Sequence, residues 1–430
     1  MEKLMQYVWQ HLLFPAAHFT AVSGESVEVV DPGLLNTGSG PDFFNAKVKI
    51  GDRMWAGNVE LHVRASDWKR HGHSTDAAYD SVILHVVAVD DARVTRPDGA
   101  EIPQIVMACN PHLREHFDEL TLRRGDGPAC ATYLPDIPAI NITDWLTALA
   151  FERLYRKSDH AAALADRFDG NWVAATYVML ARALGFGTNA EPFERLALSV
   201  PLKVLLKHSD STVSVEAILF GQSGFLASAP TTDSYVCRLK EEYSFMCSKF
   251  DLKAPASLGW KTGRIRPQNQ PHRRIALLAA MISGGFRAGY RMMEVSGVAE
   301  ARALFCTPPS AYWTHRYSFG AEDSRVPRVL SDASVASLVI NVVAPLLMAY
   351  GTRYARSEMC EKAVGILESL PPENNSVVRA FTDCAVPCSD AFASQALIEL
   401  RRSYCEPRKC LYCRIGHRIL ACKAIRVKGE

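Results

Sequence analysis

The sequence lacks the long apolar runs that mark secretion signals and membrane spans. Residues 1–14 carry Glu2, Lys3 and Gln10 among their apolar positions, so they contain no uninterrupted apolar segment of the kind found in a signal peptide. Two later apolar stretches, Ile275–Gly285 and Ser337–Tyr350, are shorter than the roughly 20 residues that a membrane span needs. We therefore expect a cytoplasmic protein without a membrane segment.

Compositional bias and internal repeats are also lacking. The 430 residues include 48 Lys or Arg against 46 Asp or Glu, and 48% of them are hydrophobic. Such a composition can build real cores, and it argues against a disordered or fibrous chain. Because the net charge is only +2, contacts with a polyanion would have to come from local basic patches.

Secondary-structure patterns divide the chain into an α/β part and a helical part. A helical pattern over residues 2–13 is followed by short β-rich runs and turn formers. The predicted strands are Val27–Val30, Ala46–Ile50, Trp55–Val63, Ser81–Val89 and Ile102–Met107. From Ile142 onward the pattern is helical, after a linker at Gly125–Pro138. We predict an α/β domain at 1–130, a helical domain at 140–380 and a cysteine-rich basic segment at 381–430.

One predicted strand of the α/β part carries polar side chains on a single face. Glu60, His62 and Arg64 alternate with apolar residues, so their side chains point to the same side of the sheet. Asp42, after Pro41, opens the strand that precedes them. An acid, an imidazole and a guanidinium on one face indicate a site.

An aspartate at the start of one strand and a Glu-x-basic pattern on the next resemble the PD-(D/E)xK nuclease superfamily. The resemblance implies that Asp42, Glu60 and the Leu61 carbonyl bind Mg²⁺ or Mn²⁺, which activates water for phosphodiester hydrolysis. His62 stands where that superfamily has lysine. An imidazole of ordinary pKa near 6.5 is mostly neutral at pH 7, so His62 suits the role of base or ligand better than that of a fixed cation.

The strand register makes a specific prediction about Asp42. With a two-residue turn at Gly51-Asp52, regular pairing places Asp42 opposite Leu61 and on the wrong face from Glu60. The site therefore requires a bulge or bend between Asp42 and Asn45. Without it, Glu60, His62 and Arg64 would be a solvated strand face and Asp42 part of an ordinary turn.

A histidine cluster just downstream offers a different metal site. His71, His73 and Asp76 fall within one short segment, and His85 lies on the next predicted strand. Imidazoles and a carboxylate at this spacing suit Zn²⁺ and would make a zinc-dependent hydrolase. The HExxH pattern of helix-borne zinc proteases is absent. The alternative is that Asp67 caps a helix and the histidines decorate a loop.

The C-terminal segment is rich in cysteine. Six of the twelve cysteines lie between Cys384 and Cys422, and Cys405, Cys410 and Cys413 follow C-x4-C-x2-C spacing. Close thiolates at this spacing suit Zn²⁺ or an iron–sulfur cluster. Cys130 is our choice for the fourth ligand, and the alternatives are Cys422, His417 and Cys388. Reduced cysteines in a core are the other interpretation.

Two basic stretches are candidate nucleic-acid contacts. Residues 401–430 hold nine Lys or Arg against two Glu. Arg266, Arg273 and Arg274 lie in a Pro-punctuated segment of the helical part, and together with Arg64 they are our predicted phosphate contacts. Solvated arginines at a helix start and a solvated basic tail are the alternatives.

Several sequence blocks together resemble a bacterial family of unknown function, family 2851, and especially its members from the Bacteroidetes. The blocks are GPDFFNAKV at 40–48, GNVELHVRASDW at 57–68, VILHVV at 82–87, ERLYRKS at 152–158, EAILFGQSGFL at 216–226, RPQNQPHRRIA at 266–276 and YCEPRKCLYCRIG at 404–416. The resemblance covers nearly the whole chain but implies no activity.

The patterns together lead to one hypothesis and two alternatives. The hypothesis is a Mg²⁺- or Mn²⁺-dependent nuclease for DNA or RNA, in which Asp42 and Glu60 hold the metal and His62 orients or deprotonates water. One alternative is a non-catalytic module on a degenerate nuclease fold that binds nucleic acid or a protein. The other is the zinc hydrolase of His71, His73, Asp76 and His85.

Overall fold

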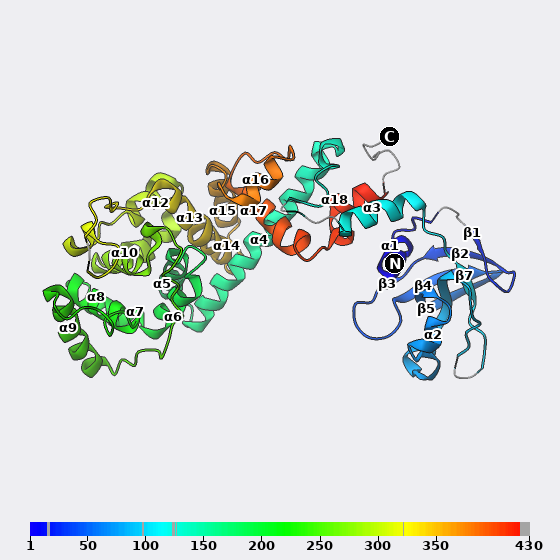
Figure 1. The fold of residues 1–430 in the computed structure, drawn as a ribbon, viewed down its shortest axis with the longest axis horizontal. Coiled ribbons are helices and arrows are strands. Elements are labelled where there is room, and N and C mark those ends of the chain that lie inside the picture. The colour runs from blue at the N-terminus through cyan, green and yellow to red at the C-terminus, as the bar shows by residue number, and fades with distance from the viewer. Residues whose placement is uncertain (15–17, 97–98, 123–124, 126, 321, 422–430) are drawn as a thin grey trace. The chain divides into compact units, whose positions relative to one another are not determined.

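A computed structural model describes residues 1–14, 18–96, 99–122, 125, 127–320 and 322–421 (Figure 1). The chain forms two compact units. Unit 1 contains Met1–Trp145, Ala380–Val386 and the described residues from Arg401 onward. Unit 2 contains Leu146–Arg379 and Pro387–Leu400. The segment 381–430, predicted as a separate domain, is thus divided between the two units.

Unit 1 is built on a seven-stranded mixed sheet with the order β1-β2-β4-β5-β6-β7, in which β3 also pairs with β4. The strands are β1 (His18–Thr20), β2 (Ser26–Asp31), β3 (Leu34–Leu35), β4 (Phe43–Ile50), β5 (Arg53–Arg64), β6 (Val82–Val89) and β7 (Gln104–Val106). The pairs from β1 to β5 are antiparallel, whereas β6 runs parallel to both β5 and β7. The predicted α/β part is confirmed; the short strands β1 and β3 were not predicted.

Helices and short turns cover this sheet and bury its central strands. Helix α1 (Glu2–Gln10) buries Leu4, Met5, Val8 and Trp9 and packs against β3 and β5. The parallel crossover from β5 to β6 contains α2 (Asp67–Arg70) and the short helices η1 (His73–Thr75) and η2 (Ala77–Tyr79). Strand β6 is buried at its first six residues, as expected for a parallel strand with both faces covered.

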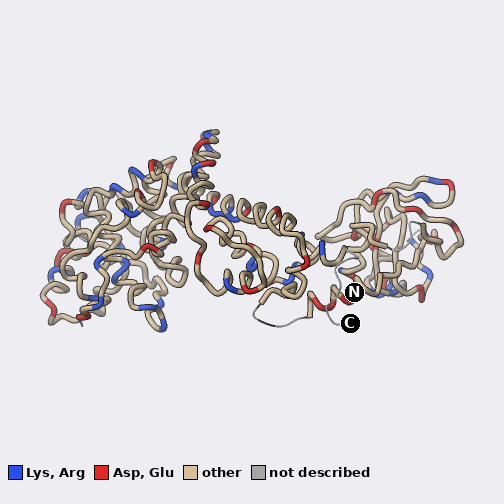
Figure 2. The backbone as a smooth tube through the Cα atoms, turned by 90° about the horizontal axis from the view of Figure 1, so that it is seen from above, with Lys and Arg blue, Asp and Glu red and all other residues tan. Residues whose placement is uncertain are grey.

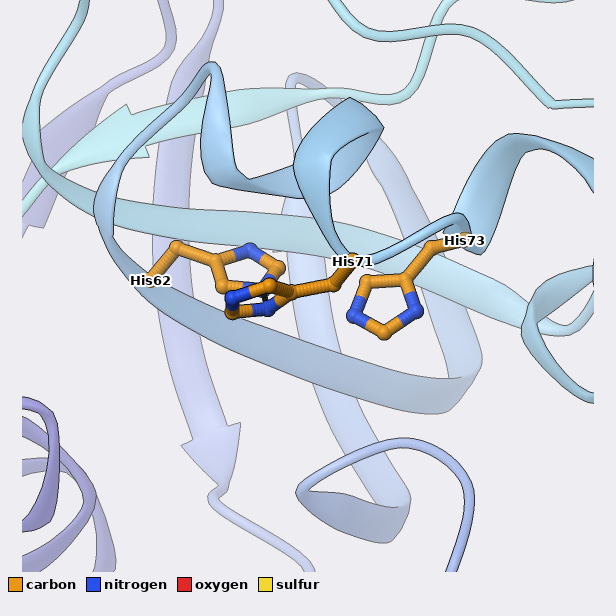
Figure 3. Close-up of side chains that lie close together, drawn as sticks. All are labelled: His62, His71 and His73. Atoms are coloured by element: carbon orange, nitrogen blue, oxygen red, sulfur yellow. Dashed lines mark hydrogen bonds between the residues drawn. The ribbon is translucent and has the colours of Figure 1, made fainter.

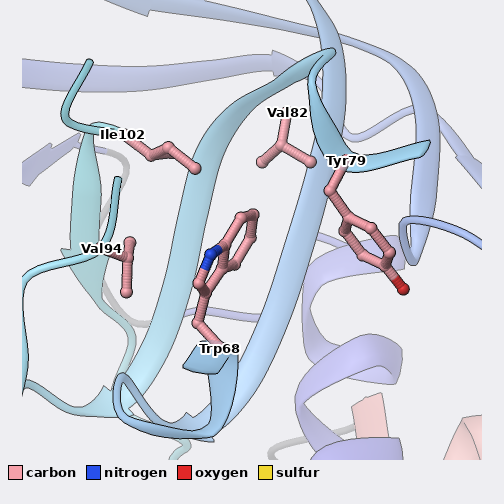
Figure 4. Close-up of a cluster of buried hydrophobic side chains, with 5 residues drawn as sticks. All are labelled: Trp68, Tyr79, Val82, Val94 and Ile102. Atoms are coloured by element: carbon pink, nitrogen blue, oxygen red, sulfur yellow. The ribbon is translucent and has the colours of Figure 1, made fainter. Parts of the chain in front are cut away.

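An apolar cluster anchors the crossover to the sheet. Trp68 of α2 and Tyr79 of η2 pack with Val82 of β6 and with Val94 and Ile102 from the segment before β7 (Figure 4). Trp68 is fully buried. Burying aromatic and branched side chains of this size contributes about 1.5 to 3 kcal/mol each, so the cluster fixes where the crossover lies.

The bulge predicted at the start of β4 is present. The β4–β5 register pairs Ala46 with Gly57, but Phe43 pairs with Val59, so β4 holds one extra residue between these pairs. Asn45 lies in this interval in the left-handed backbone region, with φ of 55°. The extra residue moves Asp42 to the position beside Glu60 that regular pairing would deny it.

The C-terminal segment of unit 1 packs beside α3 (Pro111–Leu122) and α1. It contains the short helix η9 (Cys410–Tyr412) and helix α18 (Arg414–Ala421). His417 Nδ1 lies 2.7 Å from the Tyr7 hydroxyl, and Arg414 donates to Asp144 at 2.5 Å. Residues 270 and 410 positions apart are therefore in contact within one unit.

Unit 2 is helical, as predicted from the periodicity after Ile142. The helices that lie wholly or partly in it are α4 (Ala139–Arg167), α5 (Trp172–Leu184), α6 (Ala190–Ser199), α7 (Leu202–Leu206), α8 (Thr212–Gln222), α9 (Ser234–Phe250), α10 (Pro271–Ser283), α11 (Arg287–Arg291), α12 (Val298–Phe305), α13 (Asp332–Leu338), α14 (Ala344–Arg353), α15 (Ser357–Ser369), α16 (Ser376–Thr382) and α17 (Ala391–Glu399). Helices α6 and α7 are separated at Pro201, which lacks the N–H that a continuing helix needs.

Lys and Arg are interspersed with Asp and Glu along both units (Figure 2).

The continuous helical stretch Asp332–Arg353 is long and apolar enough to cross a membrane, but 67% of its apolar window is buried inside the protein. Burial of that extent is typical of a core helix.

The bulge predicts a residue preference at position 45. Replacing Asn45 with valine should destabilise unit 1 by about 1 to 2 kcal/mol, because a branched residue tolerates the left-handed region poorly. The matched control, Asn45→Gly, should leave the free energy of unfolding nearly unchanged, because glycine adopts positive φ freely. Urea unfolding of both variants is the measurement, and equal stability of the two would contradict the bulge.

Candidate metal centre on the central strands

The bulge in β4 connects Asp42 to Glu60 through the backbone. The Asp42 N–H donates to Glu60 Oε2 at 2.9 Å, and the Leu61 N–H donates to Asp42 Oδ2 at 3.0 Å. Gln6 of α1 donates to Asp42 Oδ1 at 2.8 Å. The two predicted residues are therefore neighbours, and Asp42 holds the Glu60 carboxyl group through its own N–H.

The other oxygen of Glu60 faces a group of imidazoles. Glu60 Oε1 lies 3.5 Å from His62 Nε2 and 3.3 Å from His73 Nε2. His62 Nε2 lies 3.2 Å from His71 Nδ1. Ring nitrogens of His62, His71 and His73 all lie within 4.8 Å of one another (Figure 3). We call Glu60, His62, His71 and His73 the histidine centre.

Strand β5 and the crossover that follows it deliver these four side chains. Glu60 and His62 are alternate residues of β5, whereas His71 is the C-cap of α2 and His73 begins η1. Gly72 lies between the last two with φ of 79°, a conformation that glycine adopts without strain. This turn brings both rings back toward β5, as Figure 3 shows.

A chain of hydrogen bonds across the sheet determines which nitrogen of His62 carries its proton. Gln104 Nε2 donates to Asp90 Oδ1 at 2.6 Å, because a carboxylate can only accept. Gln104 Oε1 therefore faces His85 Nδ1, at 2.9 Å, and that nitrogen must be the donor. His85 Nε2 is then the acceptor for His62 Nδ1–H, at 2.8 Å. His62 Nε2 is left as an unprotonated lone pair pointing into the histidine centre.

The register of the sheet makes this chain possible. Glu60 pairs with His85, and His85 pairs with Gln104, along the parallel strands β5, β6 and β7. Parallel neighbours at the same level place their side chains on the same face. Strand β5 thus provides the candidate ligand His62, and β6 provides its hydrogen-bond partner His85. Strand β7 provides Gln104, which holds the His85 ring in place.

Burial shifts the pKa values of Asp42, Glu60, His62 and His85 toward the neutral form of each group. Burial lowers the pKa of His62 to about 2, helped by His85, His73 and His71, and burial lowers that of His85 to about 4. Burial also raises the pKa of Glu60, and the nearby charge of Asp42 raises it further. Burial is again the main cause that raises the pKa of Asp42. Imidazoles must be neutral to bind a metal, and a cation is the partner that buried carboxylates lack.

The spacing of the histidine centre fits a tetrahedral metal ion. Ligand atoms about 2.0 to 2.1 Å from such an ion lie roughly 3.3 to 3.4 Å from each other. Three of the six separations among these four residues are 3.2, 3.3 and 3.5 Å, and the ligand nitrogens of the three histidines all lie within 4.8 Å of one another. Donation of Nδ1–H from a ligating histidine to a second group is also typical of metal sites. The residues present therefore fit a metal ion.

One side of the centre is closed by aromatic rings and the other is open. Tyr79 stacks on His73 with ring centroids 3.8 Å apart, and Trp68 packs edge-on against His85 at 5.3 Å. His62 is only 1% exposed, whereas His71 is exposed. A substrate or water molecule would reach the centre from the His71 side.

Exposed cations lie beside the open side in sequence and structure. Arg64 ends β5, and Lys69 and Arg70 belong to α2, immediately before His71. All three are exposed. Arg64 is 3.4 Å from Asp91 and Arg70 is 2.8 Å from Asp67, and these carboxylates orient the two guanidinium groups. The predicted phosphate contact Arg64 is thus at the surface.

The zinc site predicted from His71, His73, Asp76 and His85 is brought together only in part. Asp76 points to the backbone, where its Oδ1 accepts from the Ala78 N–H at 2.9 Å and caps η2. His85 contacts His62 at Nδ1, on the side of the ring away from the histidine centre. His62 takes the place that the prediction gave to these two residues.

The predicted nucleic-acid contacts in unit 2 lie in different environments. Arg266 is exposed just before the short helix Pro267–Asn269. Arg273 and Arg274 are 2% exposed. Arg273 donates to the carbonyl of Trp313 at 2.8 Å, and Arg274 donates to Asn269 Oδ1 at 2.9 Å. Arg273 and Arg274 therefore hold the interior of unit 2 together and present no guanidinium surface to a phosphate.

The predicted cysteine ligands Cys130, Cys405, Cys410 and Cys413 all lie in unit 1 and are near enough to influence one another electrostatically. Of the alternative fourth ligands, Cys388 lies in unit 2, and Cys422 lies outside the described residues. His417 Nδ1 is bound to Tyr7.

Sequence reasoning missed the residues that support the centre. Gln6, Asp90, Gln104 and Tyr79 carry no motif, and their roles depend on strand register and ring packing. The spacing did contain a signal for the ligands themselves: a Glu-x-His pair on a strand, followed within one crossover by a His-x-His pair.

The hydrogen-bonded chain predicts that Gln104 tunes metal binding. Gln104→Leu should weaken Zn²⁺ or Mn²⁺ binding about 10- to 100-fold, because His85 would lose the acceptor that sets its tautomer. Competition titration with a chelator measures this affinity. Gln222→Leu, which truncates another buried glutamine, is the matched control and should bind metal as the wild type does. Unchanged affinity in Gln104→Leu would contradict the assigned tautomers.

Comparison with known proteins places the chain in a family. No curated protein matches it, and no solved structure matches it. Residues 2–376 match the family described as "Protein of unknown function (DUF2851)". The match includes the histidine centre and most of unit 2, and it ends before Cys405. Because it covers most of the 430 residues, the chain belongs to the DUF2851 family of proteins of unknown function.

Proposed function

We propose that this protein is a metal-dependent phosphodiesterase that hydrolyses nucleic acid at the histidine centre. The observation that carries the proposal is the convergence of His62, His71 and His73, whose ligand nitrogens lie within 4.8 Å of one another, with Glu60 Oε1 3.5 Å from His62 and 3.3 Å from His73. Three imidazoles and one carboxylate are a ligand set found in hydrolytic metal sites. The open His71 side leaves room for substrate.

The ligand chemistry favours a transition metal. Mg²⁺, which the PD-(D/E)xK resemblance implies, prefers oxygen ligands, whereas imidazole suits Zn²⁺ and other transition metals. Mn²⁺ accepts both oxygen and nitrogen ligands. We therefore propose Zn²⁺ or Mn²⁺, held by the four residues of the histidine centre, with Asp42 as the residue that orients Glu60.

The order of elements supports a nuclease-like core. A first helix, a run of antiparallel strands that ends in the pair β4–β5, a crossover and the parallel strand β6 follow one another, an order similar to that of the PD-(D/E)xK superfamily that the sequence resembles. Under this proposal Asp42 and Glu60 would correspond to its two acids. At the lysine position, His62 would be a metal ligand in place of a charged base. Resemblance of fold alone does not carry an activity, so the proposal rests on the centre.

Each residue has a defined part in the proposed hydrolysis. When bound, the metal would supply a water of lowered pKa and polarise the phosphoryl oxygen. His85 and Gln104 keep the His62 lone pair aimed inward, and the Asp42 N–H keeps Glu60 Oε1 turned toward the imidazoles. Arg64, Lys69 and Arg70 bind the phosphates of the substrate beside His71. The water oxygen forms a new bond to phosphorus as the bond to the leaving-group oxygen breaks, and the proton given up by the water ends on that leaving oxygen.

The exposed ligand His71 provides the sharpest test. His71→Ala should lower the rate of metal-dependent cleavage of DNA or RNA at least tenfold, because it removes one ligand without disturbing the buried core. His112→Ala, which truncates an exposed histidine of α3, is the matched control and should retain the wild-type rate. Both proteins are assayed on single- and double-stranded substrates with Zn²⁺ or Mn²⁺, and bound metal is measured in parallel.

Two results would contradict the proposal. In the first, the wild-type protein binds metal, His71→Ala loses it, and neither protein cleaves any nucleic acid. The metal site would then be correct, but nucleic acid would not be the substrate. Salt-sensitive nucleic-acid binding without turnover, unchanged in His71→Ala, would instead favour the non-catalytic binding module.

A further inference from the structure

The three cysteines near the C-terminus lie on a tightly folded loop. Cys405 ends a helical turn at Leu400–Cys405, Cys410 begins η9, and Cys413 immediately precedes α18. The Lys409 N–H donates to the Tyr404 carbonyl at 2.8 Å, and the Cys413 N–H donates to the Cys410 carbonyl at 3.2 Å. These bonds turn the chain back on itself twice within nine residues.

The glycine after this loop shows how closely its two ends approach. A Cβ atom added to Gly416 would lie 2.0 Å from the Cys410 carbonyl oxygen. A side chain at that position would push the start of α18 away from η9. The chain therefore needs glycine where the loop closes around its thiols.

A fourth thiol comes from a distant part of the sequence. Cys130 lies in the turn before the short helix Leu134–Asp136, and its carbonyl accepts from the N–H groups of Tyr133 and Leu134. The Arg401 guanidinium donates to the Gly127 carbonyl at 3.4 Å, so the start of the cysteine loop lies beside the segment that carries Cys130. The Cys410 thiol also lies 3.7 Å from the Leu120 carbonyl oxygen.

Donors and cations gather around these sulfurs. The backbone N–H groups of Gly416 and Ile415 donate to the Cys413 thiol, and the buried Trp145 indole lies beside it. The Arg401 guanidinium is close enough to the Cys405 thiol to act on it electrostatically. Such donors stabilise thiolates, which are the form that binds metal.

The spacing of the thiols distinguishes between two kinds of metal group. A single tetrahedral Zn²⁺ with Zn–S bonds near 2.3 Å would hold its sulfurs about 3.8 Å apart. Among the residues that the structure describes, the histidines 62, 71 and 73 form the group with three ligand atoms within 4.8 Å of one another, and the thiols form no such group. The C-x4-C-x2-C spacing with one distant cysteine also occurs in iron–sulfur proteins.

We propose that Cys130, Cys405, Cys410 and Cys413 bind an iron–sulfur cluster that joins the C-terminal segment to the rest of unit 1. The cluster connects the loop before α18 to the turn that follows α3. Its ligands are separate from the histidine centre, so the proposal does not depend on the proposed hydrolysis.

Metal analysis of the full chain purified without oxygen tests this assignment. We expect iron and acid-labile sulfide in comparable amounts, a broad visible absorption, and a paramagnetic signal after reduction or oxidation. Cys130→Ala should lose most of the iron and sulfide. Cys237→Ala, in unit 2, is the matched control and should retain both.

A second variant separates ligand loss from unfolding. Cys130→Ser keeps the size of the side chain and offers oxygen in place of sulfur, so the cluster should persist with a shifted absorption and paramagnetic signal. Zinc without sulfide in the anaerobic protein would overturn the proposal. A cluster with the same spectrum and the same iron content in all three variants would also overturn it, because Cys130 would then not be a ligand.

Discussion

The burial of Glu60 and His62 on the central strands is the constraint on which the architecture of unit 1 depends. A carboxyl group and an imidazole taken out of water cost several kcal/mol unless each polar atom finds a partner. Glu60 is 5% exposed and His62 is 1% exposed. The fold meets this cost with hydrogen bonds from neighbouring strands, and it leaves one group of lone pairs directed at a common point. A cation at that point would complete the compensation.

Several local features exist to serve this arrangement. The bulge at Asn45 brings the Asp42 N–H to Glu60 Oε2, and Gly72 turns two histidines back toward β5. The Asp90 carboxylate fixes the orientation of the Gln104 amide, Gln104 sets the tautomer of His85, and His85 sets the tautomer of His62. Trp68 and Tyr79 close the apolar side. The same crossover thus provides ligands, orientation and exclusion of water.

Much of this arrangement could be predicted from local patterns. Alternation along β5 placed Glu60 and His62 on one face, and the parity of the hairpin required the bulge that the structure contains. The helical part followed from its periodicity. These features depend on neighbours in sequence, so the sequence is sufficient to predict them.

The remainder depends on contacts that sequence spacing does not encode. The turn at Gly72 brings His71 and His73 to His62, whereas the register of β6 places His85 at His62 Nδ1. Gln104 and Asp90 belong to the site only because parallel strands align them. Arg273 and Arg274 looked like a basic surface because periodicity does not reveal which arginines are enclosed by later helices. The short strands β1 and β3 have too few residues for any pattern.

The central claim is that His62, His71 and His73 bind one metal ion with Glu60. Its most direct test is a crystal structure of the protein soaked with Zn²⁺ or Mn²⁺, with the ion located by its anomalous scattering. The account predicts one ion about 2.0 to 2.2 Å from His62 Nε2, His71 Nδ1 and His73 Nε2. An ion bound between the carboxylates of Asp42 and Glu60 without an imidazole ligand would contradict it, as would histidine rings that remain unbound at saturating metal.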